Sequence, residues 1–171
     1  MKKIIFIAII FILTFNISYA DNVYFMDFSK VLNTSIAGKK AQVFLKNKFS
    51  KEQDKFKKIE KEILDEERSL ISKKKLISAE EYQKNIITLR EKVANLQKNK
   101  QSSINNIAKL RNNAKKELLS KLNPILKSYM ENKRIRVVID KKEVLYGDSN
   151  LEITAQVIEI LNKKVKTLSL K

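Results

Sequence analysis

The chain has 171 residues, with 36 lysine and arginine residues against 19 aspartate and glutamate residues, a formal net charge of +17. It contains neither cysteine nor histidine, which excludes disulfides, thiolate nucleophiles, imidazole bases and the usual zinc ligands. Its two glycines are too few for a glycine-rich phosphate loop, so the composition argues against an enzyme and indicates no catalytic residue, cofactor or metal.

The first 20 residues have the pattern of a cleavable signal peptide. A basic start is followed by a largely apolar stretch at residues 4–17 and a small-x-small site at residues 18–20. The apolar stretch is shorter than the roughly 20 residues that a transmembrane helix needs. We therefore expect export and a mature chain that begins at Asp21, with a retained membrane anchor as the alternative.

The mature chain opens with strand-forming residues and then becomes helical. Residues 23–26 (Val-Tyr-Phe-Met) predict a strand, and Asp27 or Ser29 can cap a short helix. Gly38 is expected to mark a joint. Residues 39–122 contain no glycine or proline and consist mostly of good helix formers, which predicts a long helical arm.

The arm has the apolar periodicity of a coiled coil. Apolar residues recur every seven positions in its first half and in a four-three alternation in its second: Phe49, Phe56, Ile63, Leu70, then Tyr82, Ile86, Leu89, Val93, Leu96. Ser78 and Glu81 have the spacing of a capping box, so a new helix starts there. Because the connection is short, we predict an antiparallel hairpin with its tip near residues 72–78. Folding about residue 76 sets Phe56 opposite Leu96 and Phe49 opposite Ser103.

The last 49 residues regain β-type character. Pro124 is expected to kink or restart the second helix, which then runs to about Asn132. Residues 134–140 and 143–146 are predicted to form a β-hairpin around a Lys-Lys turn. A terminal helix follows, with one apolar face formed by Ile153, Val157, Ile160 and Leu161. The predicted class is α+β, mainly α: the arm stands on a mixed β/α body made from residues 21–38 and 123–171.

In this order the elements resemble the Skp, or OmpH-type, family of periplasmic chaperones over essentially the whole mature chain. The matching pieces are Asp27 after the opening strand, the segments at 30–39 and 78–81, and the ending from 137–140 through 153–154, with Glu152 where the family usually has aspartate. The resemblance implies a periplasmic homotrimer whose three arms surround a cavity. It also implies an ATP-independent holdase that binds unfolded outer-membrane β-barrel proteins.

Candidate binding residues lie on the arm and in the body. Residues 39–122 hold 23 basic and 11 acidic side chains, an excess that can attract acidic clients, anionic lipid or lipopolysaccharide. A merely solubilising tip is the alternative for its lysines. The candidate client or lipid contacts are Lys73, Lys74, Lys75, Lys84, Arg90 and two residues off the seam, Phe44 and Leu64. The predicted oligomer interface consists of Val23, Phe25, Val137 and Ile139, because the strands are too few to close a core within one chain.

Two other functions remain open at this stage. A coiled-coil spacer or adaptor of the cell envelope would have the same helical pattern, but would need a lipid or peptidoglycan anchor that the sequence does not display. A nucleic-acid-binding protein would fit the basic composition. The signal peptide and the lack of a reading motif argue against it, so no nucleic-acid partner is expected.

Overall fold

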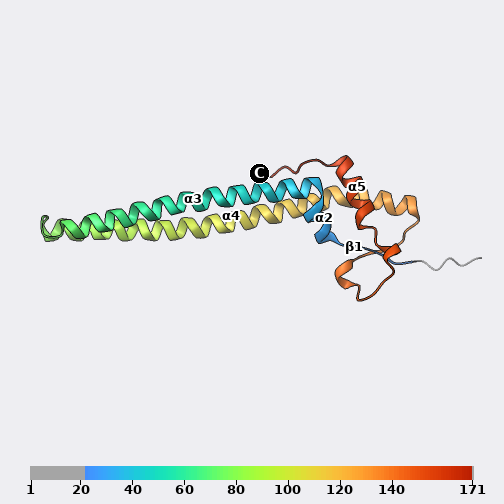
Figure 1. The fold of residues 1–171 in the computed structure, drawn as a ribbon, viewed down its shortest axis with the longest axis horizontal. Coiled ribbons are helices and arrows are strands. Elements are labelled where there is room, and N and C mark those ends of the chain that lie inside the picture. Colours follow the sequence, from blue (N-terminus) through green and yellow to red (C-terminus); the bar gives the residue numbers. More distant parts are fainter. Residues whose placement is uncertain (1–21, 171) are drawn as a thin grey trace, which may run out of the picture.

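The computed structural model describes residues 22–170, and the predicted signal peptide and its cleavage site lie outside them. The elements in chain order are β1 (Tyr24–Met26), α2 (Phe28–Thr34), α3 (Ile36–Lys73), α4 (Ala79–Lys133), β2 (Val138–Asp140), 3-10 turns at Lys141–Glu143 and Ser149–Leu151, and α5 (Thr154–Lys164). Helices α3 and α4 form a long antiparallel arm on a small body with both strands, α2 and α5 (Figure 1). The mainly α, α+β class is confirmed. Across residues 22–170, no helix is both long and apolar enough to cross a membrane.

The break between α2 and α3 lies at Ser35, three residues before the predicted joint. The Asp27 carboxylate accepts a hydrogen bond from the Lys30 amide at 2.8 Å and caps α2, and the Ser35 hydroxyl accepts one from the Gly38 amide at 3.1 Å and caps α3. Gly38 lies in the first turn of α3, where a Cβ atom would be 2.0 Å from the Leu32 carbonyl oxygen. Its role is therefore to let α2 and α3 approach closely.

The arm helices are long and α4 passes through its proline. Helix α3 has 38 residues, about 57 Å at 1.5 Å per residue. Helix α4 begins as predicted, with the Ser78 hydroxyl accepting a hydrogen bond from the Glu81 amide at 3.1 Å. It continues without a restart through Pro124 to Lys133. Proline inside a helix costs about 3 kcal/mol, and burial of Leu122 and its neighbours in the body offsets that cost.

The predicted β-hairpin at 134–146 is wrong. Strand β2 pairs in parallel with β1, with Phe25 opposite Ile139, and the other edge of β1 bridges Glu152. Asp140 caps a 3-10 turn by accepting a hydrogen bond from the Lys142 amide at 3.2 Å. This turn carries the chain out of the sheet. A Lys-Lys pair lacks the glycine or asparagine that two-residue hairpin turns favour, so the long-range parallel pairing prevails.

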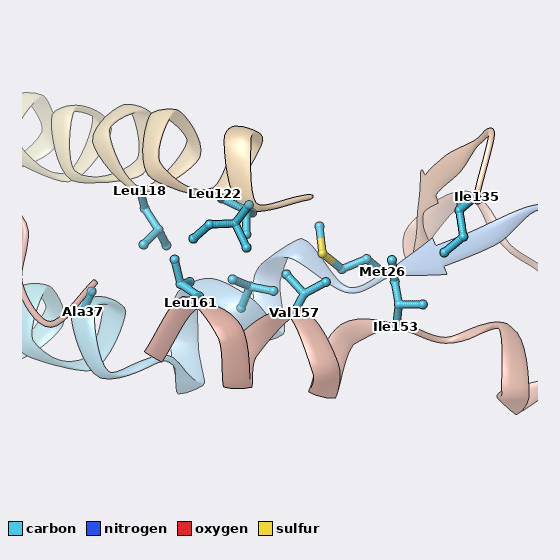
Figure 2. Packing of buried hydrophobic residues seen from close by; sticks show 10 residues of the cluster. Met26, Ala37, Leu118, Leu122, Ile135, Ile153, Val157 and Leu161 are labelled. Carbon is cyan, nitrogen blue, oxygen red and sulfur yellow. The ribbon is translucent and has the colours of Figure 1, made fainter. Parts of the chain in front are cut away.

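A single apolar cluster joins the body to the base of the arm (Figure 2). Leu118 and Leu122 of α4 meet Val157 and Leu161 of α5, with Val31 of α2 in the same cluster. The remaining buried members are Met26, Ala37, Ile125, Ile135 and Ile153. The predicted apolar face of α5 is confirmed, although Ile160 is only half-buried. Because α4 belongs to both arm and body, the base of the arm is fixed by the core.

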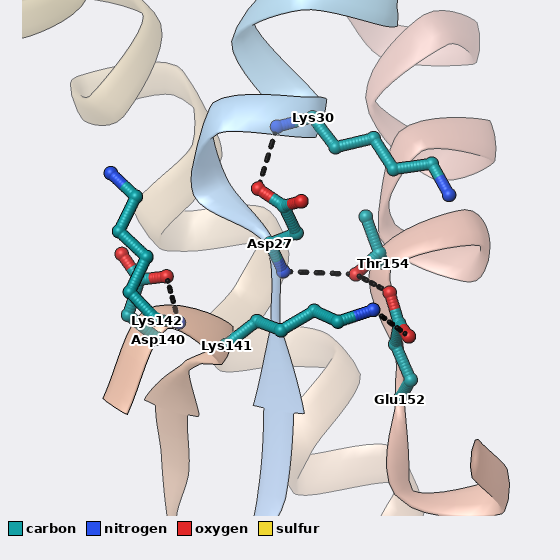
Figure 3. A network of polar contacts seen from close by, with 7 residues as sticks. All are labelled: Asp27, Lys30, Asp140, Lys141, Lys142, Glu152 and Thr154. Atoms are coloured by element: carbon teal, nitrogen blue, oxygen red, sulfur yellow. Dashed lines mark hydrogen bonds and ion pairs between the residues drawn. The ribbon is translucent and has the colours of Figure 1, made fainter. Parts of the chain in front are cut away.

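A polar network ties the two ends of the body together (Figure 3). The Asp27 amide donates to the Thr154 hydroxyl at 2.9 Å, and that hydroxyl donates to the Glu152 carboxylate at 2.9 Å. The Lys141 ammonium donates to the second Glu152 oxygen at 2.7 Å. Residues from the end of β1, the turn after β2 and the start of α5 are thus held in one chain of hydrogen bonds.

The network should make the stability of the body sensitive to acid. Hydrogen bonds from Lys141 and then Thr154 lower the pKa of Glu152. The stabilisation is present above the unfolded value of about 4.3 and is lost as pH falls through the lower folded pKa. Glu152→Gln should therefore reduce stability at neutral pH and flatten its decline below about pH 5. Lys141→Gln should cause a smaller loss of stability of the same kind, and urea unfolding at several pH values measures both variants. If the free energy of unfolding fell equally steeply with pH in wild type and in Glu152→Gln, the prediction would be contradicted.

Candidate functional site

Positive charge is concentrated on the part of α4 that approaches the body. Residues 92–121 include eight lysine and arginine residues and a single acidic residue, Glu117. Lys92 and Lys100 are used in ion pairs with α3. The others are exposed: Lys98, Lys109, Arg111, Lys115, Lys116 and Lys121. This basic surface can attract anionic groups over about one Debye length, roughly 8 Å at physiological salt.

The two helices of the arm pair about one heptad away from the predicted register. The Lys92 ammonium contacts the Glu66 carboxylate at 2.6 Å, and Lys100 pairs with Glu60. Folding about residue 76 would instead set Glu60 opposite Lys92. Heptad positions repeat, so a shift of seven residues preserves an apolar seam and periodicity alone does not distinguish the two registers. Exposed pairs of this kind contribute about 0–1 kcal/mol each, enough to favour one register.

The middle of the arm is less tightly packed than its base. Phe56 and Leu96 are buried as predicted, whereas the predicted seam residues Phe49 and Val93 are each 41% exposed. Grooves of about 560 and 280 Å³ flank this region, and Phe56 and Ser103 line both. A serine at the seam fills less space than leucine, which leaves the grooves open. The smaller groove also has Phe49 in its wall, so it presents apolar surface to solvent.

The candidate lysines at the tip lie together in space, whereas the other candidates are spread along the arm. Lys73 ends α3, and Lys74 and Lys75 lie in the turn. The Lys74 ammonium lies 5.6 Å from the centre of the Tyr82 ring, a cation–π contact that holds one of the three in place. Lys84 and Arg90 are exposed, about 8 and 17 Å along α4 from its first residue.

The off-seam apolar candidates are exposed but far apart. Phe44 is 42% and Leu64 44% exposed, and 20 residues of α3, about 30 Å, separate them. The structure therefore gives a series of separate apolar contacts along the arm. Further exposed apolar residues that the sequence analysis missed are Val43, Ile71, Leu76, Ile87 and Ile104. Their positions off the heptad pattern were a signal that could have identified them.

The proposed interface residues of the body fall into two groups. Val23, Val137 and Ile139 are 48%, 47% and 37% exposed, whereas Phe25 is buried within the chain. Leu145 and Tyr146, predicted as part of a strand, are fully exposed. The sheet edge and this loop present apolar side chains to solvent. Within residues 22–170, no three acidic side chains gather to hold a metal ion.

Comparison with known proteins identifies the family. The family model described as "Outer membrane protein (OmpH-like)" matches residues 22–161. A protein of known structure from Caulobacter crescentus, described as a candidate OmpH-like outer membrane chaperone, is 19% identical and has a TM-score of 0.82. The match covers 88% of this chain and 89% of that chain, and at this identity it shows the fold alone. No curated protein matches the sequence. Since the family model covers well over half of the sequence, the chain belongs to the OmpH-like outer membrane protein family.

Proposed function

We propose that this chain is an exported, periplasmic holdase that binds unfolded outer-membrane β-barrel proteins without ATP and prevents their aggregation. Membership of the OmpH-like family supports a chaperone role. The observation that carries the proposal is the arm, which spans about 57 Å and presents separate apolar side chains within a basic surface. Weak contacts of this kind can hold an unfolded chain and release it without an energy source.

The proposed contacts combine charge with small apolar sites. Phe44 and Leu64 each expose less than half of their surface, so each contact removes little apolar area from water and adds little binding energy. Several such contacts on one client add up because they are linked along the arm. Lys73, Lys74, Lys75, Lys84 and Arg90 speed the encounter with an acidic chain. The tip lysines are also proposed to contact anionic lipid or lipopolysaccharide.

We further propose that the working form is a homotrimer assembled through the body. Val23, Val137 and Ile139 expose apolar surface along a two-stranded sheet, which is too small to be stable on its own. Leu145 and Tyr146 add to this surface beside the sheet. Pairing of such edges between copies would bury these residues, and a trimer would set three arms around a common space.

Electrostatic capture is tested by charge reversal. Changing Lys73, Lys74, Lys75, Lys84 and Arg90 to glutamate should slow stopped-flow capture of an acidic, urea-unfolded outer-membrane protein about tenfold at low salt. Wild-type capture should slow by a similar factor towards roughly 0.5 M salt.

The control reverses five exposed lysines of the body and tail: Lys127, Lys133, Lys142, Lys164 and Lys166. It changes the net charge equally, so its capture rate should fall less. Equal rates for both variants and wild type would show that the arms work through apolar contacts alone.

A further inference from the structure

The C-terminal tail, residues 165–170, is bound to the base of the arm. The family model ends at residue 161 and α5 ends at Lys164. The chain then leaves the helix in extended conformation at Val165 and runs back beside the arm (Figure 1). The tail thus lies beyond the residues that the family model matches, whereas the surface that it contacts on α4 lies within them.

Two contacts far apart in sequence hold the tail. The Ser169 amide donates a hydrogen bond to the Glu117 carboxylate of α4 at 2.8 Å. Leu168 packs against the buried cluster, as does Val165. Val165, Leu168 and Leu170 are half-buried, whereas Lys166, Thr167 and Ser169 are exposed. The base of the arm therefore binds an extended chain through the apolar side chains and one main-chain amide of that chain.

This mode of binding does not require the particular sequence of the tail. A carboxylate accepts a hydrogen bond from the main-chain amide of any residue except proline. The last residues, Leu168-Ser169-Leu170, alternate apolar and polar side chains, which is also the pattern of strands in outer-membrane barrels. We propose that the tail is a built-in competitor that occupies a client-binding surface at the arm base, and that an extended client segment can displace it. This inference rests on the proposed holdase function and assigns that function one binding surface and one means of release.

The tail is suited to easy displacement and rapid return. Its contacts are few: one main-chain hydrogen bond to Glu117 and the packing of two half-buried side chains, Val165 and Leu168. Because it is tethered, its effective concentration is in the millimolar range. A client segment that detaches for a moment would therefore be replaced by the tail, which favours client release without ATP.

Truncation after Lys164 tests the proposal in the otherwise complete mature protein. Dissociation of a fluorescent, urea-unfolded outer-membrane β-barrel protein should slow about threefold or more, because client segments no longer compete with the tail. A labelled peptide with the sequence of residues 165–171 should bind the truncated protein and not the full-length one, and the unfolded client should displace it.

Two substitutions keep the test valid if truncation disturbs folding. Leu168→Asp removes an apolar contact of the tail and leaves the arm unchanged, so it should slow client release, whereas Lys166→Ala at an exposed position should not. Glu117→Ala removes the acceptor that the tail and a client segment would share, so it should weaken binding of the labelled peptide to the truncated protein. Unchanged release in the folded truncated protein and in Leu168→Asp, or no peptide binding to the truncated protein, would overturn the proposal. If the full-length protein captured no client, the holdase function would be refuted instead, and binding of the labelled peptide would still report whether the arm base binds an extended chain.

Discussion

Replacing Gly38 by alanine should destabilise the protein by about 3 kcal/mol or more, or prevent folding. The added Cβ atom would lie 2.0 Å from the Leu32 carbonyl oxygen and 2.9 Å from the Ser35 hydroxyl that caps α3. Relief of this overlap requires movement of the α2 backbone, which packs through Val31 into the core. The measurement is urea unfolding followed by helical circular dichroism, at one fixed protomer concentration.

Gly147→Ala is the matched control for this substitution. Its added Cβ atom would lie 3.1 Å from the Phe25 ring and 3.3 Å from the Val144 side chain. Both neighbours are side chains that can move by a few tenths of an ångström, so we expect a change below about 1 kcal/mol. Similar losses for the two glycines would contradict the close approach of α2 to α3.

Removing the arm should separate assembly from client protection. Deletion of residues 45–110, with the ends joined by a tight turn, leaves the buried cluster of the body intact, including Leu118 and Leu122. We expect this variant to remain an oligomer in multi-angle light scattering, because apolar body contacts carry assembly. Its protection of an unfolded outer-membrane protein should fall strongly, because Leu64, the tip lysines and most other exposed apolar side chains of the arm are gone. A monomer would refute assembly through the body, and retained protection would refute binding by the arm.

The elements that depend only on neighbouring residues were the ones best predicted from the sequence. The Ser78 cap and the start of α4 follow from a hydroxyl three residues before the Glu81 amide, a local arrangement. The buried faces of α4 and α5 follow from helical periodicity. The family resemblance is likewise confirmed by the model that matches residues 22–161.

The errors occurred where distant segments compete. Strand β2 pairs with β1, more than 110 residues away in sequence, and no local pattern distinguishes that pairing from a hairpin. The register of the arm is ambiguous because heptads repeat, and the ion pairs of Glu66 with Lys92 and of Glu60 with Lys100 reveal the shift. Pro124 stays inside α4 because packing in the body outweighs the local preference to end a helix.

The candidate site residues, like the elements of the fold, were predicted correctly where local patterns decide and wrongly where distant segments pack together. Phe44 and Leu64 are exposed as their off-seam positions indicated. Phe25 was assigned to the interface because the strands are too few to close a core within one chain, but the Val144–Gly147 loop lies against its ring, so Phe25 is buried inside the chain. Loop packing of this kind leaves no periodic signal in the sequence. The tail contact with Glu117 was equally invisible, because 52 residues separate the two groups.

The central claim is tested most directly by diluting a urea-unfolded outer-membrane β-barrel protein into buffer and following light scattering, with the mature protein present or absent and no nucleotide added. The proposed function predicts that scattering falls in proportion to the amount of protein added and vanishes near a fixed ratio of protein to client. Unchanged scattering at a large excess of folded protein would contradict the holdase function.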